Sequence, residues 1–288
     1  MLVGFLGDVH GQVFHALAVV ATCQARLGRR FDLVVQVGDL GAYPEPARMD
    51  EASRRYLVAD PSQADFGRLL RATGRRAESL RRLRAQLAAP LHFLRGNHDD
   101  VAWLATLRRD EASGTAPVDR FDLFRYVPDG AVLDVGSWRL GFLGGAEEEG
   151  GTAAGIDPAA VEALASRGAG AFEVLVTHDA PYGAAVGFHG QIQGARAVTR
   201  VLDAVQPAFH VAGHLTLIGP RRLAAPVSLV LDGISASPLW SPSPYLQAGC
   251  LAVLDTDGPD LRVIADDWLA RFPQDLDFDA HVDALASR

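Results

Sequence analysis

Short apolar runs rich in β-branched residues alternate with longer amphipathic stretches along the sequence, and this alternation constrains the fold more than any other feature. Short runs of this kind favour buried strands, whereas apolar residues that recur every three or four positions favour helices. Alternating strands and helices predict an α/β protein built from packed layers. Strands are expected at residues 2–6, 32–37, 91–94, 138–143, 172–177, 209–212, 227–231, 251–254 and 261–264. Helices are expected at residues 15–27, 66–87, 101–107, 157–167 and 195–205.

Length and composition predict one domain that needs neither disulfides nor a structural metal to fold. The chain has 288 residues, 49% of them hydrophobic, which is enough to bury a large core. It contains only two cysteines, Cys23 and Cys250, and no apolar stretch long enough to cross a bilayer. The first expected strand begins directly after Met1, which argues against a secretory signal. We therefore expect a single domain over residues 1–288 in the reducing cytoplasm.

The charge balance excludes several classes of function. The net charge is −8, which argues against binding to nucleic acid or to an acidic membrane surface. All 27 side chains counted as Lys or Arg are arginines, because the sequence contains no lysine. Schiff-base chemistry and a Walker-type phosphate loop are therefore excluded. Nothing in the sequence indicates an oligomeric state.

Residues 43–87 are interpreted as an insertion that acts as a lid or as a wall beside the substrate. Its first part, residues 43–65, is polar and shows no clear period, as functional segments often do. The helix expected after it has one apolar stripe and one arginine-rich face. We interpret that face as a solvated surface, with a basic wall that steers an anionic substrate as the alternative. Its arginines are Arg68, Arg71, Arg75, Arg76, Arg81, Arg82 and Arg84.

A residue type that ligates metals follows the end of five of the expected strands. Ligands bind at the carboxyl ends of strands in open α/β sheets, so these side chains should gather at one edge. Most of the segments place a glycine directly before a candidate ligand, which lets the backbone approach an ion closely. Each motif alone is common by chance, whereas the ordered set points to a metal site. The segments are Gly7-Asp8-Val9-His10-Gly11, Gly38-Asp39, Gly96-Asn97-His98-Asp99, Thr177-His178-Asp179-Ala180-Pro181 and Gly213-His214-Leu215-Thr216.

The chemistry of these residues fits a centre with two divalent cations. Such a centre needs a bridging carboxylate, flanking oxygen or imidazole ligands and an open position for water. Asp39 stands alone at a strand end and is the natural bridge, and Asp8 with His10 can serve one metal. An amide oxygen and two imidazoles can serve the second metal, namely those of Asn97, His178 and His214. A donor set without thiolates suits Mn, Fe, Zn or Ni better than Ca or a structural zinc.

The ordered set resembles the motifs of the calcineurin-like metallophosphoesterases. The resemblance implies a two-sheet α/β sandwich flanked by helices, and two divalent metal ions that act on phosphate esters through a metal-bridging hydroxide. It assigns Asp8 and His10 to the first metal, Asp39 to both, and the other ligands to the second. His98 would lie near the leaving group and protonate it, and Asp99 would orient His98. The matching residues are Asp8-x-His10, Gly38-Asp39, Gly96-Asn97-His98-Asp99, His178 and Gly213-His214.

The sequence departs from the family pattern at two positions. Thr216 stands where the family usually has the second histidine of Gly-His-x-His, so the first metal site is expected to be weak, open or water-filled. His189, in a glycine-rich loop, is a candidate replacement ligand, whereas His210 is expected to pack in the core. Ala42 stands where family phosphatases often have an aspartate that supports the catalytic histidine. That support must come from Asp99 or from the insertion, or it is absent.

The substrate is expected to meet further side chains around the metals. Arg95, His189 and Thr216 are candidate contacts for it, although Arg95 at a strand end can equally form a surface ion pair. Tyr182 is expected either to close over a ring of the substrate or to pack against the fold. The residues and the resemblance together predict a cytoplasmic metal-dependent hydrolase that acts on a small phosphodiester or nucleotide-type phosphoester. The alternative is a metal-binding scaffold of the same fold with weak or lost catalysis.

Overall fold

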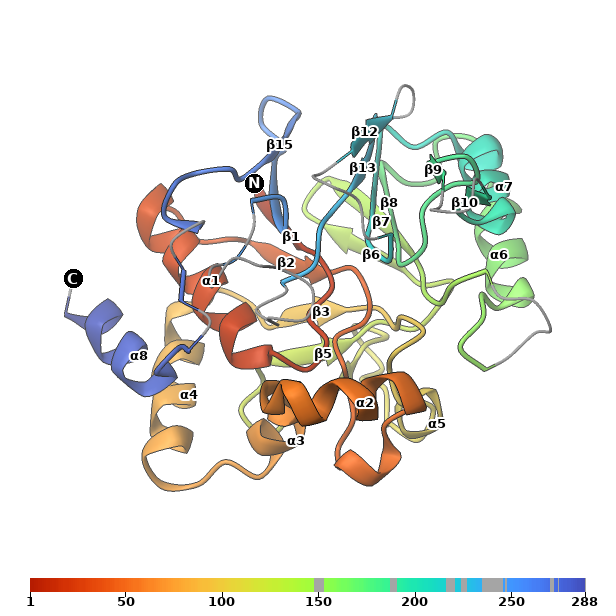
Figure 1. The fold of residues 1–288 in the computed structure, drawn as a ribbon. Coiled ribbons are helices and arrows are strands. Elements are labelled where there is room, and N and C mark those ends of the chain that lie inside the picture. The colour runs from red at the N-terminus through yellow and green to blue at the C-terminus, as the bar shows by residue number, and fades with distance from the viewer. Residues whose placement is uncertain are drawn as a thin grey trace.

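Two β-sheets that pack face to face form the centre of the fold (Figure 1). The computed structural model describes residues 1–147, 153–186, 191–215, 221–223, 227–234, 246, 248–269, 272–273 and 275–287. Within these residues, the first sheet has the spatial order β15 (Asp260–Val263), β14 (Leu251–Asp255), β1 (Leu2–Leu6), β2 (Leu33–Gln36), β3 (Leu91–Phe93), β5 (Phe124–Tyr126) and β4 (Ala116–Pro117). The second sheet has the order β12 (Arg221–Leu223), β13 (Val227–Val230), β11 (Phe209–Ala212), β8 (Val174–Thr177), β7 (Trp138–Leu143) and β6 (Val132–Val135).

Helices cover the outer face of each sheet. Those on the first sheet are α1 (Val13–Leu27), α3 (Asp65–Leu70), α4 (Gly74–Gln86) and α8 (Phe278–Ala286). Those on the second sheet are α6 (Pro158–Ala165) and α7 (Arg196–Val205). A short hairpin of β9 (Ala185–Val186) and β10 (Ile192–Gln193) lies beside α7 in Figure 1. No helix in the described segments is long and apolar enough to span a membrane.

Alternation of side chains along the strands builds the layers. Val3 and Phe5 of β1 point into the apolar cluster between the two sheets. Leu2 and Leu6 of the same strand point the other way, into the cluster that holds α1, α4 and α8. On the second sheet, Leu175 of β8 packs outward with α6 and α7. The sequence therefore folds into the expected two-sheet α/β sandwich flanked by helices.

Parallel strands in the middle of both sheets bring several loops to one edge. β1, β2, β3 and β5 are parallel neighbours in the first sheet. β7, β8, β11 and β13 are parallel neighbours in the second. The carboxyl ends of parallel strands meet at the same edge of a sheet. The five segments that carry candidate metal ligands follow β1, β2, β3, β8 and β11, as expected from the sequence.

The insertion is more regular than its sequence suggests. The part without a clear period contains the 3₁₀ turn η1 (Pro46–Arg48), helix α2 (Glu51–Ala59) and the 3₁₀ turn η2 (Pro61–Ala64). The single helix expected at residues 66–87 is wrong, because the chain forms α3 and α4 instead. The break falls at Thr73, which is extended, and at Gly74, whose φ of 56° lies in the left-handed region. The apolar stripe continues across the break, so periodicity alone does not reveal it.

Three arginines of α4 pair with acidic side chains of α8. Arg75 and Arg82 both pair with Asp283, and Arg76 pairs with Asp279 at 3.0 Å. The Arg76 guanidinium also lies 4.5 Å over an aromatic ring of α1. These three arginines therefore pair with α8 instead of forming a basic wall, and the Arg75 side chain, which is 67% exposed, keeps the solvated character expected of this face.

His210 of β11 is a core residue, as expected. Its Nε2 lies 2.8 Å from Oγ1 of Thr177 and its Nδ1 lies 3.1 Å from Oγ of Ser228. The side chain is fully buried, and this burial lowers the pKa of His210 to about 3. Neither ring nitrogen is therefore available to replace the ligand that Thr216 lacks.

The buried imidazole of His210 should make folding sensitive to acid. The unfolded chain binds a proton near the ordinary histidine pKa of about 6.5, whereas the folded chain does not, so stability falls as the pH drops below that value. Between about pH 6.5 and pH 4.5, the loss from His210 is expected to reach up to about 2.7 kcal/mol. Urea unfolding of wild type and His210→Gln at both pH values measures it. Equal acid dependence in the two proteins would contradict the assignment.

Candidate metal centre

Asp39 lies at the middle of a cluster built from five loops, which follow β1, β2, β3, β8 and β11. Its Oδ2 is 3.8 Å from Nε2 of His10 and 3.5 Å from Nε2 of His178. Nε2 of His10 is in turn 4.0 Å from Oδ2 of Asp8. The potential ligand atoms form two groups, each within 4.8 Å, which are Asp8 with His10 and Asp39, and Asp39 with His178 and His214. Asp39 is therefore the residue that the two groups share.

Asn97 and His214 complete the second group. Oδ1 of Asn97 is 3.0 Å from Nε2 of His178, and the rings of His178 and His214 lie 4.9 Å apart between centroids. The six residues predicted as metal ligands are thus brought together from both sheets. We call Asp8, His10 and Asp39 the first donor group, and Asp39, Asn97, His178 and His214 the second donor group.

The orientation of His178 is that of a metal ligand. Its Nδ1 lies 3.0 Å from the carbonyl oxygen of Val37, to which it can donate a hydrogen bond. A histidine that ligates a metal typically donates its other N–H in this way, which fixes the tautomer and frees Nε2. In this structure Nε2 faces the oxygens of Asn97 and Asp39. The side chain is fully buried, so its direction is fixed by packing.

Three of the predicted ligands occupy strained backbone conformations. His10, Asp39 and His214 have φ values of 45°, 54° and 65°. Residues with side chains rarely adopt this left-handed region, and such strain persists where surrounding contacts hold it. The Asp39 carbonyl accepts hydrogen bonds from the backbone N–H groups of Val9 and His10, and the His214 N–H approaches the Asp8 carboxylate at 3.2 Å. The ligand loops therefore hold one another in place.

Two glycines allow the ligand loops to lie close to the carboxylates of Asp39 and Asp8. A Cβ atom on Gly96 would lie 2.0 Å from Oδ1 of Asp39, and one on Gly213 would lie 2.2 Å from Oδ1 of Asp8. Both distances are far below van der Waals contact, so no larger residue fits without displacing a ligand. The glycines predicted to bring backbone near an ion in fact bring it against the carboxylates.

Opposed charges offset the cost of burial in the cluster. Burial alone would raise the pKa of Asp39, but the His178 imidazole holds that pKa well below its usual range. Burial alone would lower the pKa of His178, but the Asp39 carboxylate raises it to about 10. Burial raises the pKa of Asp8 to about 7. A divalent cation would compensate both carboxylates and take the place of the proton on His178, so these residues fit a metal.

His98 lies beside the first donor group and is oriented from the insertion. Its ring centroid is 5.7 Å from that of His10, and its backbone N–H donates to Oδ1 of Asp39 at 2.7 Å. Its Nδ1 is 2.9 Å from Oδ2 of Asp50, the residue that caps α2. Burial would lower the pKa of His98, but the hydrogen bond with Asp50 and the charge of Asp39 raise it to about 9.

Within the described residues, Asp99 makes no hydrogen bond to the His98 imidazole. Its Oδ1 accepts the backbone N–H of Ala42 and its Oδ2 accepts that of Gly96, both at 2.7 Å. Asp99 therefore ties the loop after β2 to the loop after β3. Sequence reasoning named the insertion as a possible source of support for His98 but missed Asp50. The signal was available in Asp50 and Ser53, which have the spacing of a helix N-cap.

Arg95 is not brought to the ligands as a phosphate contact. Its guanidinium is buried, with Nε donating to Oδ2 of Asp129 at 2.7 Å and one terminal nitrogen donating to the Gly155 carbonyl at 2.8 Å. The other terminal nitrogen reaches two further carbonyls at 3.3 Å. Arg95 therefore forms an ion pair with Asp129, and this pair is buried, not the surface pair that was the alternative. His189 and Thr216 lie outside the described residues.

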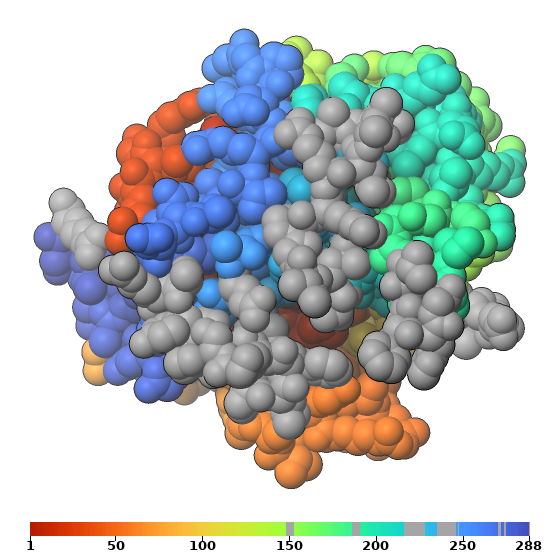
Figure 2. Space-filling model, turned by 45° about the horizontal axis from the view of Figure 1, so that its top comes forward, coloured from red at the N-terminus to blue at the C-terminus, as the bar shows by residue number. Residues whose placement is uncertain are grey.

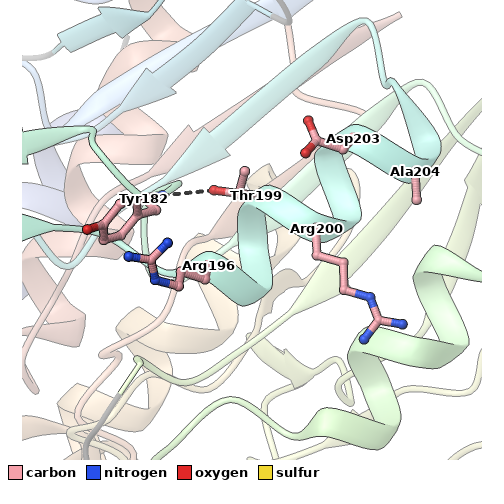
Figure 3. A pocket seen from close by; sticks show the side chains of 6 residues that line it. All are labelled: Tyr182, Arg196, Thr199, Arg200, Asp203 and Ala204. Atoms are coloured by element: carbon pink, nitrogen blue, oxygen red, sulfur yellow. Dashed lines mark hydrogen bonds between the residues drawn. The ribbon is translucent and has the colours of Figure 1, made fainter.

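Tyr182 lines a separate cavity of about 500 Å³ along one face of α7 (Figure 3). The guanidinium of Arg196 lies 3.7 Å over its ring, and its backbone N–H donates to Oγ1 of Thr199. Arg200, one turn further along the helix, pairs with Glu162 of α6. The packing interpretation of Tyr182 thus agrees with its neighbours, which come from α7.

The sequence model of the calcineurin-like phosphoesterase family matches residues 1–215, and the chain belongs to that family. No curated protein gives a significant match. One crystal structure is similar with a TM-score of 0.50 and 12% identity, covering 92% of this chain and 98% of its own. A novel archaeal phosphodiesterase is similar with a TM-score of 0.37 and 11% identity, covering 92% and 99%. Vps29 of Entamoeba histolytica in complex with Zn²⁺ gives 0.33 and 14%, covering 92% and 97%. At these identities the likeness concerns the fold alone.

Proposed function

We propose that this protein hydrolyses a small phosphodiester or nucleotide-type phosphoester with two divalent cations. Membership of the calcineurin-like phosphoesterase family implies metal-dependent phosphoester hydrolysis. The observation that carries the two-cation form is the Asp39 carboxylate, which is shared by the two donor groups. The oxygen and imidazole donors favour Mn, Fe, Zn or Ni.

Each donor group has a defined task in this proposal. The first donor group would hold one cation and the second donor group the other, with Asp39 between them. When bound, the two cations supply positive charge for the phosphoryl oxygens and lower the pKa of an attacking water. The strained loops and the close approach at Gly96 and Gly213 keep the ligand side chains in position before substrate arrives.

His98 is suited to protonate the leaving oxygen. It stands next to both donor groups without belonging to either, and Asp50 occupies its Nδ1, which leaves Nε2 for the substrate. The hydrogen bond with the Asp50 carboxylate raises the pKa of His98, which favours the protonated imidazole that proton donation requires. Proton donation by a placed side chain typically accelerates such a step about 10²–10⁴-fold.

The insertion is proposed to act as a wall. Asp50 contacts His98, Arg48 pairs with Asp100, and Nε2 of Gln12 donates to Oδ2 of Asp60 at 2.8 Å. The segment is therefore tied to the loops after β1 and β3. Figure 2 shows it, in orange, as a ridge along one side of the molecule. A wall fixed at several points suits a small substrate better than a hinged lid does.

Metal content measured together with hydrolysis tests the proposal. We expect two metals per chain by elemental analysis after loading with Mn²⁺, and hydrolysis of bis(4-nitrophenyl) phosphate by the loaded protein. One metal per chain without hydrolysis of any phosphoester offered would favour the scaffold with lost catalysis. Two departures from the family pattern motivate the scaffold alternative. The absence of an aspartate at Ala42 argues less strongly for lost catalysis, because Asp50 contacts His98 instead. The other departure, Thr216, lies outside the described residues.

A further inference from the structure

The Asp50 carboxylate is the centre of a hydrogen-bond network that ends on His98. Oδ2 of Asp50 accepts the hydroxyl of Tyr43 at 2.5 Å and that of Ser53 at 2.9 Å, and it lies 2.9 Å from Nδ1 of His98. Oδ1 accepts the backbone N–H of Ser53 at 2.8 Å, which caps α2. Tyr43 is buried, so its hydroxyl is held in one direction. The carboxylate therefore has very little freedom to turn away from His98.

Asp99, next to His98 in the sequence, is not available to orient the His98 imidazole. Both oxygens of Asp99 are engaged by backbone N–H groups of two different loops. The site where family phosphatases often place a supporting aspartate is Ala42, whose backbone N–H is one of those donors. The described part of the chain offers His98 one carboxylate at hydrogen-bond distance from its side chain, and that carboxylate comes from the insertion.

We propose that Asp50, held by Tyr43 and Ser53, is the positioning residue for His98 and fixes the imidazole through Nδ1 so that Nε2 faces the leaving oxygen. This inference rests on the proposed function. Asp50 acts through His98, and within the described residues its carboxylate contacts Tyr43, Ser53 and His98 and none of the predicted metal ligands. Because the same carboxylate caps α2, the insertion must be folded for the acid to be in place.

The anchoring of the insertion explains how this contact is kept. Arg48, two residues before Asp50, pairs with Asp100, which caps α5 (Val101–Leu104) directly after the His98 loop. Arg48 and Asp50 thus contact the loop between β3 and α5 at two residues, Asp100 and His98. At the far end of α2, Asp60 accepts from Gln12. Rigid support of this kind is what keeps a proton donor within reach of its target.

The dependence of the rate on the leaving group tests the role of Asp50. Methyl 4-nitrophenyl phosphate releases an anion that needs little protonation, whereas methyl phenyl phosphate releases a more basic one. Asp50→Asn keeps the size and the cap of α2, because Asn is as good an N-cap as Asp. We expect it to lower kcat about 10²-fold for the phenyl ester and less than about tenfold for the nitrophenyl ester, with KM and metal content nearly unchanged.

A matched control and a double variant separate positioning from structure. Glu51→Gln removes the same charge one residue further along α2, at an exposed side chain that pairs with Arg55, and should leave both rates unchanged. Asp50→Asn combined with His98→Gln should be no slower than His98→Gln alone, since both act through one group. Equal losses on both esters, or losses that add to those of His98→Gln, would overturn the positioning role.

A measurement without turnover distinguishes this inference from the proposed function. In protein labelled with ¹⁵N-histidine, the Nδ1–H signal of His98 should be shifted by Asp50→Asn and untouched by Glu51→Gln. If Asp50→Asn leaves the Nδ1–H signal of His98 unchanged, the inference is overturned, whatever the hydrolytic activity. If Asp50→Asn shifts the signal but the wild-type protein hydrolyses neither ester with any metal, the proposed function is overturned while the contact between Asp50 and His98 stands.

Discussion

Asp39→Asn is expected to lose both metals and to slow phosphodiester hydrolysis at least about 10³-fold, which is about 4 kcal/mol of barrier. Asp39 is the single carboxylate that belongs to both donor groups, so neutralising it weakens two sites with one change. An amide oxygen can ligate a metal, but it brings no charge to compensate two cations. The variant should therefore behave as a protein without its metal centre.

The fold should survive this substitution. Asn has the size of Asp, and its Oδ1 can still accept the backbone N–H of His98. Elemental analysis should find close to no metal in Asp39→Asn, and about one metal per chain in Asp8→Asn, which removes a ligand from the first donor group alone. Circular dichroism and urea midpoints check that each variant is folded. Two metals per chain in folded Asp39→Asn would contradict the bridging role.

The ligand cluster could be predicted because its signals are local. Each candidate ligand follows a short apolar strand, and parallel strands bring their carboxyl ends to one edge whatever the details of packing. Asp39 could be named as the bridge because it stands alone at its strand end. The strand and helix pattern alone predicts an α/β protein of packed layers, and the two-sheet sandwich was expected from the resemblance to the calcineurin-like metallophosphoesterases.

The partners of charged side chains could not be predicted because they come from distant parts of the chain. Asp50 lies 48 positions before His98 in a stretch without a clear period, and only the folded insertion brings the two together. Arg95 was a candidate phosphate contact because its sequence neighbours are ligands, but its guanidinium pairs with Asp129. Pairing across such separations depends on tertiary packing, which sequence spacing does not encode.

The arginines of α4 also show that sequence spacing does not reveal the partners of charged side chains. Their spacing correctly marks one face of a helix, but spacing does not say what covers that face. Asp279 and Asp283 stand four positions apart, so they lie on one face of α8 and meet Arg75, Arg76 and Arg82. A search for matching helical charge patterns in the two segments would have suggested this interface.

Gly96→Ala is expected to damage the metal centre from a residue that ligates nothing. Its new Cβ would lie 2.0 Å from Oδ1 and 2.3 Å from the backbone nitrogen of Asp39. Since one of these atoms is backbone, the strain cannot be relieved by a side-chain rotation, and Asp39 must move. Overpacking of this kind costs about 1–3 kcal/mol of unfolding free energy. A displacement of about 1 Å at a reacting centre costs about 10²-fold in rate, so we expect a loss of that size.

Gly258→Ala is the matched control for this steric argument, because a Cβ on Gly258 meets open space and its backbone is outside the left-handed region. Its unfolding free energy should stay within about 0.5 kcal/mol of wild type, with full metal content. Manganese titration and hydrolysis of bis(4-nitrophenyl) phosphate compare the two variants. Full activity in Gly96→Ala would show that the loop after β3 can move away from Asp39. The close approach of Gly96 would then not be what holds Asp39 in its position.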